Sequence, residues 1–260
     1  MQLTAKSSVD SVRREMISKM LIPLPPLPEQ TAIATALKDT EDLINSLEKM
    51  IAKKKLIKQG AMQELLKPKA GWVVKNISEV GEVKRGASSQ QIKYLKSDGV
   101  RLIRINDFFD NNPVFVQPTA DIMRYKINEY DILFAGTGNS AGASYIAPNE
   151  WIGLPHSYNA PRIRINKNEN RTYIYYCLQS HHILLQQKEK FVGAAQPFLD
   201  TSAIANFKIL YPNSTEQNAI ATTLVEMDSE INSFEIKLQK CKIFKEGKMQ
   251  QLLTGKIRLI

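Results

Sequence analysis

Residues 136–142 (GTGNSAG) form a glycine-rich turn directly after an apolar run, and their spacing approaches that of a phosphate-binding loop. Loops that cradle nucleotide phosphates follow GxxxxGK[ST] or GxGxxG patterns, in which backbone N–H groups face the phosphates. The spacing here fits neither pattern, and no lysine follows it. We therefore interpret the segment as a turn whose glycines let the backbone approach a partner closely.

Other residue types that could do chemistry are scattered. His156, His181 and His182 are the only histidines, and none belongs to an HExxH pattern or a carboxylate cluster of the kind that binds zinc. We expect His181 and His182 to be surface residues of a helix. The sequence also lacks GxSxG, an Asn-Pro-Pro-Tyr-like tetrapeptide and a nuclease-type carboxylate–lysine group. These absences predict a chain that is not itself a catalyst and holds neither cofactor nor metal.

The composition is that of a globular protein with a basic balance. The 260 residues are 43% apolar and carry 35 Lys and Arg against 26 Asp and Glu, a net charge of +9. This charge suits a polyanionic partner, although an ordinary soluble protein can also be basic without one. No apolar run approaches the roughly 20 residues that span a bilayer, and the first residues resemble no signal peptide. The lack of such a run predicts a protein without a membrane partner. The two cysteines have no metal-binding spacing, and we expect a cytoplasmic protein.

An internal repeat with an offset of 187 residues organises the chain. Residues 29–37 (EQTAIATAL) return as residues 216–224 (EQNAIATTL), and the same offset aligns INS at 44–46 with INS at 231–233. Further identities follow at the same offset, including Gly60 with Gly247, and no gap is needed. A fixed offset indicates two copies of one structural unit.

Each copy of the repeat predicts a long helix. Apolar residues in the second copy alternate at steps of four and three, which is typical of a coiled-coil seam: Ile220, Leu224, Met227, Ile231, Phe234, Leu238 and Cys241. The first copy has the same seam with polar interruptions at Thr40 and Lys54. Each helix should run about 38 residues, and Gly60 and Gly247 should mark a kink or an early end.

The start signals and the charges of these helices agree with this interpretation. Pro28 suits a first helical turn, and Ser214 with Gln217 predicts a capping box. In each helix acidic residues come early and lysines come late, so antiparallel pairing would bring opposite charges together. We expect the two helices to pack antiparallel, within one chain or between chains. The alternative is two solvated helices that each pack on the globular part.

Between the two predicted helices, the spacing of apolar residues no longer follows the helical period. Residues 100–105, 131–135 and 162–165 alternate or run apolar like strands, and residues 173–190 read as a helix. We predict a mixed α/β domain over residues 70–212, between a helical segment at 25–69 and a second one at 213–260. Residues 1–24 resemble the end of a preceding domain, because they align at the repeat offset with the end of the 70–212 domain.

The helix starts and ends resemble the central conserved region of type I restriction-modification specificity (S) subunits. The matching segments are IPLPPLPEQ at 22–30, the stretch 53–66, GW at 71–72, VGEVKRG at 80–86, YDIL at 130–133, Pro212 with Glu216 and Gln217, and LLTGK at 252–256. The resemblance covers nearly the whole chain. It implies an α/β target recognition domain, with 1–24 as the remnant of another one, flanked by two long helices that form an antiparallel coiled coil.

The resemblance also implies function and partners. Such subunits read a bipartite double-stranded DNA sequence with two recognition domains, dock two methyltransferase (modification) subunits through their helices, and join restriction subunits in an ATP- and S-adenosylmethionine-dependent complex. The specificity subunit recognises DNA and the other subunits do the chemistry. This sequence departs from the pattern because it holds one complete recognition domain. We expect either a truncated product or a half-subunit that works as a homodimer or with a second half-subunit.

A recognition domain needs donors and acceptors for base edges and cations for phosphates. The candidates lie in polar loops of the 70–212 domain, and we list them as expected DNA contacts: Lys84, Arg85, Ser88, Gln90, Lys93, Thr137, Asn139, Ser140, His156, Tyr158, Asn159 and Gln196. Arg85 and Lys93 suit phosphate or guanine, and amide side chains suit adenine. Each could instead be a solvated loop residue. Arg101 and Arg104 alternate on a predicted strand and could be only its solvent face.

Apolar residues off the seam of the first helix suggest a second neighbour for it. Leu43, Met50 and Ile57 lie on another face, which could pack on a methyltransferase subunit or on the chain's own recognition domain. The main alternative to DNA recognition is a coiled-coil scaffold without DNA binding, and salt-dependent DNA affinity would separate the two. A hydrolase or nucleotide-binding enzyme is a third hypothesis, which the missing motifs disfavour.

Overall fold

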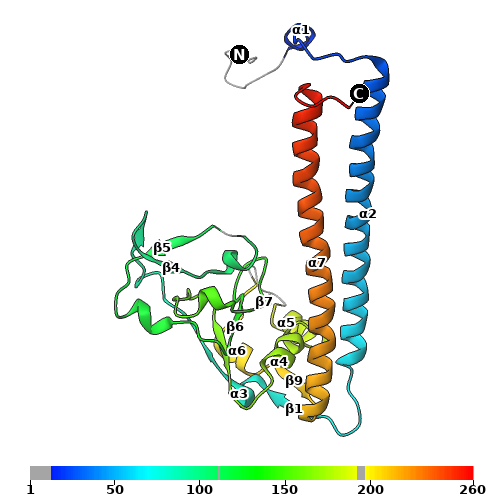
Figure 1. The fold of residues 1–260 in the computed structure, drawn as a ribbon. Helices are drawn as coiled ribbons and strands as arrows, with labels where there is room; N and C mark the ends of the chain where they lie inside the picture. The colour runs from blue at the N-terminus through cyan, green and yellow to red at the C-terminus, as the bar shows by residue number, and fades with distance from the viewer. Residues whose placement is uncertain (1–12, 111, 192–196, 260) are drawn as a thin grey trace. The chain divides into compact units, whose positions relative to one another are not determined.

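The computed structural model describes residues 13–110, 112–191 and 197–259 (Figure 1). The chain forms two compact units. The first unit joins the residues up to Leu56 with those from Ser229 onward, and the second covers Ile57–Asp228. The two longest helices, α2 (Leu27–Leu65) and α7 (Ser214–Leu253), contribute to both units.

In the first unit α2 and α7 pack antiparallel. Ion pairs join the acidic part of each helix to the basic part of the other: Glu41–Lys245, Glu48–Lys242, Lys54–Glu230 and Lys55–Glu235. The early acidic residues Glu41 and Glu48 of α2 pair with the late α7 residues Lys245 and Lys242, and the later Lys54 and Lys55 pair with the earlier Glu230 and Glu235, which only antiparallel helices allow (Figure 1). The antiparallel coiled coil expected from the sequence is therefore confirmed. Acidic residues of each helix pair with lysines of the other, as the charge pattern predicts.

The seam between these helices supplies the apolar contact. Ile33, Ile44, Leu47 and Ile51 of α2 and Ile231 of α7 are each at most 7% exposed. Burying an aliphatic side chain contributes about 1.5–3 kcal/mol, whereas a partly exposed ion pair contributes about 0–1 kcal/mol. The seam therefore stabilises the pair, and the charges select its direction.

The polar interruption at Thr40 is accommodated within the seam. Thr40 is buried, and its hydroxyl donates to the carbonyl oxygen of Ala36 at 2.9 Å. Lys248 Nζ donates to the same hydroxyl oxygen at 3.3 Å. Because both the donor and an acceptor position of the hydroxyl are used, its burial carries no uncompensated polar cost.

The two long helices begin in the same way, as the repeat predicts. Gln30 Nε2 donates to the carbonyl oxygen of Pro25 at 2.7 Å, and Gln217 Nε2 donates to that of Pro212 at 2.8 Å. The predicted capping box at Ser214 is wrong by one residue. Asn213 caps α7 instead, because its Oδ1 accepts from the Glu216 backbone N–H at 2.9 Å.

The repeat is also visible in the elements before each long helix. Helix α1 (Arg14–Ser18) and helix α6 (Thr201–Ala205) stand at the same offset as α2 and α7. Strand β9 (Lys208–Tyr211) follows α6 and pairs with β1 (Val73–Asn76), whereas residues 21–24 at the matching positions are not a strand.

The second unit contains a four-stranded antiparallel sheet in the order β2-β8-β6-β7. Its strands are β2 (Gly81–Lys84), β8 (Arg162–Ile165), β6 (Asp131–Phe134) and β7 (Ser144–Ile146). A three-stranded antiparallel sheet has the order β3-β5-β4, from β3 (Tyr94–Leu95), β5 (Val114–Val116) and β4 (Val100–Leu102). The strand runs predicted near 131 and 162 correspond to β6 and β8.

Short helices connect these strands. They are α3 (Ile77–Val80), η1 (Ile105–Phe108), η2 (Ile122–Tyr125), η3 (Asn149–Trp151), α4 (Arg171–Leu178) and α5 (His181–Phe191). The mixed α/β fold class predicted from the sequence, with its flanking long helices, is confirmed.

Strand β6 divides the core of the second unit, because successive side chains of a strand point to opposite faces. Ile132 and Phe134 join a cluster that includes Tyr173 of α4 and Leu224 of α7. Leu133 lies on the other face with Trp151, in a second buried cluster. This burial on both faces explains why the strand reads as a continuous apolar run.

Two local predictions are wrong. The single helix expected over residues 173–190 is two helices, α4 and α5, because the backbone turns at Gln179 and Ser180 and the Ser180 hydroxyl then accepts from the Ile183 N–H at 3.4 Å. The strand expected over residues 100–105 ends at Leu102, since the Asp107 carboxylate accepts from the Arg104 N–H at 2.9 Å and starts η1. His181 and His182 are exposed on α5, as expected.

Among the described residues, no helix combines the length and the apolar character that crossing a membrane would require.

The repeated glycines Gly60 and Gly247 offer a test of the two helices. Neither ends its helix, contrary to the early end considered from the sequence, and a Cβ at either position would meet nothing within 4 Å. Alanine should therefore raise the free energy of unfolding by about 0.5–1 kcal/mol per site. Urea denaturation of Gly60→Ala and Gly247→Ala measures this, and destabilisation would contradict an open helix surface at that position.

Candidate nucleic-acid interface

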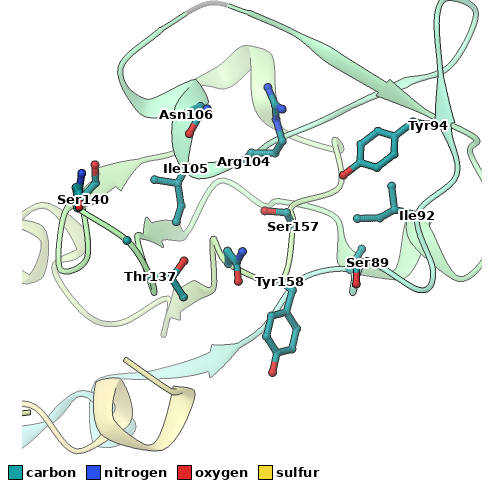
Figure 2. A pocket seen from close by; sticks show the side chains of 14 residues that line it. Ser89, Ile92, Tyr94, Arg104, Ile105, Asn106, Thr137, Ser140, Ser157 and Tyr158 are labelled. Atoms are coloured by element: carbon teal, nitrogen blue, oxygen red, sulfur yellow. The ribbon is translucent and has the colours of Figure 1, made fainter. Parts of the chain in front are cut away.

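A hollow of about 500 Å³ lies on the second unit where four loop segments converge (Figure 2). The segments supply two tyrosines, several amide and hydroxyl side chains and two isoleucines. The lining residues are Ala87, Ser89, Ile92, Tyr94, Arg104, Ile105, Asn106, Thr137, Gly138, Asn139, Ser140, Ser157, Tyr158 and Asn159. In Figure 2, Asn106, Ser140 and Thr137 lie on one side of the hollow, and Ser89, Ile92 and Tyr94 lie on the other.

Backbone hydrogen bonds fix the central segment of the hollow, residues 155–159. The Ala87 N–H donates to the carbonyl oxygen of His156 at 2.8 Å, and the Tyr158 N–H donates to that of Ala87 at 2.7 Å. On its other side, the Ser157 N–H donates to the Ile103 carbonyl oxygen at 2.9 Å. The segment is therefore paired on both edges, which positions Ser157, Tyr158 and Asn159 without a regular strand.

Gly86 makes this close approach of two backbones feasible. A Cβ at Gly86 would lie 2.0 Å from the His156 carbonyl oxygen and 2.5 Å from that of Ser157. No side chain fits that space, so the pairing of residues 86–88 with 155–158 requires glycine here.

The glycine-rich turn at 136–142 is anchored by its backbone to other segments. The Gly136 N–H donates to the Asn159 carbonyl oxygen at 2.9 Å, and its own carbonyl oxygen accepts from Leu199 at 2.8 Å. Gly138 and Gly142 adopt φ of 79° and 96°, which favour glycine. At Gly142 a Cβ would collide with the side chain of Gln187, 2.2 Å away. The backbone at Gly142 thus lies directly against the Gln187 side chain of α5.

Five of the residues expected to contact DNA line the hollow. They come from two loops that are adjacent in space, and they are Thr137, Asn139, Ser140, Tyr158 and Asn159. Asn139 and Asn159 are exposed, and Tyr158 is 41% exposed, so their polar groups are accessible. The sequence places these residues in two separate turns, and the fold brings the two turns together.

The other expected residues lie outside the lining. Lys84 pairs with Glu82 at 2.7 Å, and its hydrogen bond lowers the pKa of that carboxyl. Ser88 donates its hydroxyl to Gln91 Oε1 at 3.1 Å, while Gln90 and Lys93 are exposed.

The remaining expected residues are Arg85, Gln196 and His156. Arg85 is half-buried beside the ring of Tyr158, and Gln196 lies outside the described residues.

His156 does not fit its expected role as a DNA contact. Its side chain is buried, and Nδ1 lies 2.7 Å from the carbonyl oxygen of Ala160, so this nitrogen carries the proton. Within the described part of the chain, its buried Nε2 has no hydrogen-bond partner. Desolvation lowers the pKa of His156 to about 4, so the ring is neutral at pH 7. A turn of the sequence His-Ser-Tyr-Asn looks polar, but its first residue points into the core.

Buried carboxylates engage most arginines near the hollow. Asp107 pairs with Arg101 at 2.7 Å and lies 3.5 Å from Arg104, and Asp131 pairs with Arg164 at 2.8 Å. Both carboxylate side chains are fully buried. Arg101 and Arg104 are therefore half-buried structural partners of Asp107, rather than a plain solvent face of a strand. A buried carboxylate needs such cations, because an unpaired charge in the interior costs several kcal/mol.

Sequence reasoning missed Tyr94, Asn106 and Ser157 in the lining. Asn106 directly follows residues 100–105, which the sequence predicts as a strand, and a polar residue after a predicted strand was a usable signal. Tyr94 adjoins the candidate Lys93, but its position over the hollow depends on the pairing of β3 with β5. Nothing in the local sequence distinguishes Ser157 from its neighbours.

The chemistry available at the hollow is hydrogen bonding and stacking. Its side chains are hydroxyls, amides, tyrosine rings and one paired arginine. Among the described residues no group of three or more His, Cys, Asp or Glu could hold a metal ion. Cys177 lies in the core, and its burial raises the pKa of the thiol to about 12, which keeps it protonated. The arrangement suits recognition of a polar, aromatic-bearing partner.

Comparison with known proteins gives a consistent picture. Residues 69–240 match the family model described as type I restriction modification DNA specificity domain. The chain is 26% identical to the type I restriction enzyme MjaVIII specificity subunit of Methanocaldococcus jannaschii, over 98% of this chain and 66% of that protein. The chain thus spans just under two thirds of the length of this relative.

Two solved structures share the fold. One is a type I restriction-modification S subunit from M. genitalium, with a TM-score of 0.64 at 15% identity over 96% of this chain and 68% of that one. The other is the HsdS subunit from Thermoanaerobacter tengcongensis, with a TM-score of 0.56 at 16% identity over 97% of this chain and 65% of that one.

The burial of neutral His156 predicts a pH dependence of stability. An unfolded histidine titrates near 6.5, whereas His156 titrates at about 4 when folded, so the unfolded chain binds more protons between these values. This group should lower the free energy of unfolding by about 3 kcal/mol as the pH falls from 7 to 4, with no change above pH 7. Denaturation of His156→Gln across this range should show a flatter profile, and the exposed control His181→Gln should match the wild type.

The steric requirement at Gly86 gives a second test. Gly86→Ala forces apart the backbones of residues 86–88 and 155–158, so it should cost about 1–3 kcal/mol of stability. The same substitution at Gly60 has open space and serves as the matched control. Equal melting temperatures for the two variants would show that the close pairing does not hold in solution.

Proposed function

Because the chain belongs to the family of type I restriction-modification DNA specificity domains, we propose that it is the DNA sequence-recognition (specificity) chain of such a system. Its domain at 70–212 reads one half of a bipartite target in double-stranded DNA. The match of residues 69–240 to the family carries this proposal. The chain itself is not catalytic, and partner subunits perform methyl transfer and cleavage.

The hollow and its rim form the DNA-reading surface in this proposal. Asn139 and Asn159 present exposed amides, which can pair bidentately with an adenine edge, and Gln90 offers the same chemistry outside the hollow. The hydroxyls of Ser88, Thr137 and Ser140 add weaker donors and acceptors.

Arg85 and Lys93 supply positive charge for phosphate or guanine in this proposal, and Lys84 contributes when it exchanges Glu82 for DNA. Gln196 remains a candidate from the sequence alone.

The long helices form the docking surface for methyltransferase subunits, and restriction subunits join through that complex. In the first unit, apolar side chains lie outside the seam: Leu43 is 44% exposed and Met50 is 41% exposed on α2, while Phe244 is 58% exposed on α7. Apolar surface of this kind on a helix already paired along its seam supports a further protein partner.

In this proposal residues 70–212 are the target recognition domain, 25–69 and 213–260 are the central and distal conserved helices, and 1–24 are the remnant of another recognition domain. A bipartite target requires two recognition domains. We propose that a second copy of this chain, or another half-subunit, supplies the second domain, since antiparallel helices and a two-fold arrangement of domains are compatible.

Methylation mapping tests the function. Co-expression of the chain with a type I methyltransferase subunit in a host lacking adenine methylation should produce one bipartite methylated motif. Expression of the methyltransferase subunit alone is the control and should leave the genome unmodified. Two identical halves in inverted orientation would indicate two copies of this chain, because protein symmetry is mirrored in the site.

The contradicting result is equally specific. If both proteins are stably expressed and co-purify but no motif is methylated, the chain acts as a scaffold without DNA recognition. If they do not co-purify, the proposed docking surface on the helices fails instead.

A further inference from the structure

Two aromatic rings hold the guanidinium of Arg85 in the second unit. Its central carbon lies 4.1 Å from the centroid of the Tyr158 ring and 5.0 Å from that of Phe198. Arg85 follows β2, whereas the two rings come from other loops of the same unit. Contacts at these distances are cation–π interactions, which attract the guanidinium to the two rings.

The backbone holds both rings in place. Tyr158 belongs to the segment that is paired on both edges, and its N–H donates to Ala87 at 2.7 Å, two residues after Arg85. Phe198 forms a bridge with Thr137, and the next residue, Leu199, donates to Gly136 at 2.8 Å. The backbone positions of Tyr158 and Phe198 therefore do not depend on the arginine.

Arg85 differs from neighbouring cations in its charge environment. Lys84 and Arg162 share Glu82 at 2.7 and 3.2 Å, and Arg164 is held by Asp131. For Arg85, no ion pair or hydrogen bond involves the guanidinium within the residues that the structure describes. Its positive charge is neutralised by no carboxylate there.

Stacking leaves the hydrogen-bonding capacity of this arginine available. A guanidinium carries five N–H donors, and contact with an aromatic ring does not pair these donors with a hydrogen-bond acceptor. Tyr158 is 41% and Phe198 46% exposed, so the stack lies at the surface rather than in the core. The side chain is thus ordered before any partner binds, which lowers the entropy cost of binding.

We propose that Tyr158 and Phe198 are positioning residues that hold Arg85 ready for a pair of acceptor atoms on duplex DNA. This rests on the proposed DNA recognition. The acceptor pair is two phosphate oxygens or the O6 and N7 atoms of guanine, which share one geometry of bidentate recognition. Tyr158 then acts on DNA through Arg85, and Phe198 becomes a member of the interface.

Binding of the full chain to two fluorescent duplexes of about 30 base pairs tests this, one of mixed sequence and one of poly(dA)·poly(dT). Arg85→Ala should weaken binding by about tenfold at low salt. For a phosphate contact the loss occurs on both duplexes, and the slope of log affinity against log salt falls by about 0.9. For a guanine contact the loss is confined to the mixed sequence.

The ring variants test the positioning itself. Tyr158→Leu and Phe198→Leu should each lose about two- to tenfold in affinity, and Tyr158→Phe, which keeps the ring, should lose less than Tyr158→Leu. In the Arg85→Ala background the same leucine substitutions should have no further effect, because their contribution passes through the arginine. Melting temperatures should stay within a few degrees of the wild type, since both rings are surface residues.

Different failures point to different errors. Wild-type chain that binds neither duplex at any salt concentration overturns DNA recognition and the stack together. Wild-type binding that Arg85→Ala weakens, while the leucine variants do not, overturns the positioning role alone. Leucine variants that lower the melting temperature and leave DNA affinity unchanged show a purely structural stack, which also overturns it.

Discussion

The double-sided backbone pairing of residues 155–159 is the constraint on which the candidate interface depends. This segment hydrogen-bonds to Ala87 on one edge and to Ile103 on the other. The pairing demands glycine at position 86, buries His156 and turns Tyr158 and Asn159 outward. Loops are usually mobile, but here a loop behaves like the central strand of a small sheet. Recognition side chains gain from that rigidity, since less conformational entropy is lost when a partner binds.

Buried carboxylates in the second unit divide its basic residues into those that form structural ion pairs and those that do not. Asp107 and Asp131 are fully buried and take Arg101, Arg104 and Arg164 as partners. These pairs satisfy charges that the core could not otherwise hold. Basic residues that look equivalent in the sequence therefore differ in what they can do. The guanidinium of Arg85 contacts aromatic rings, so its N–H donors can still bind another molecule. An arginine paired with an aspartate already uses donors in that pair.

In the coiled coil of the first unit, one set of residues stabilises the helix pair and another set selects its antiparallel orientation. Aliphatic residues such as Ile44 and Leu47 provide the buried contact, while ion pairs such as Glu48–Lys242 are compatible with only one orientation. Helices with the same seam and unpolarised charges could pair either way. The antiparallel arrangement relates the two helix repeats by an approximate two-fold operation.

The sequence alone predicted the family, the mixed α/β class, the two long helices and their antiparallel pairing. These follow from the repeat, from the four-three spacing of apolar residues and from polarised charge, which are local or periodic properties of the chain. It also placed Thr137, Asn139, Ser140, Tyr158 and Asn159 in polar turns. The tertiary fold brings particular turns together, and the sequence could not predict which ones, because contacts between residues far apart in the chain leave no periodic signal. It removed His156 from the surface, joined Phe198 to Arg85 and divided the predicted helix at Ser180, since burial and pairing depend on neighbours that the local sequence does not name.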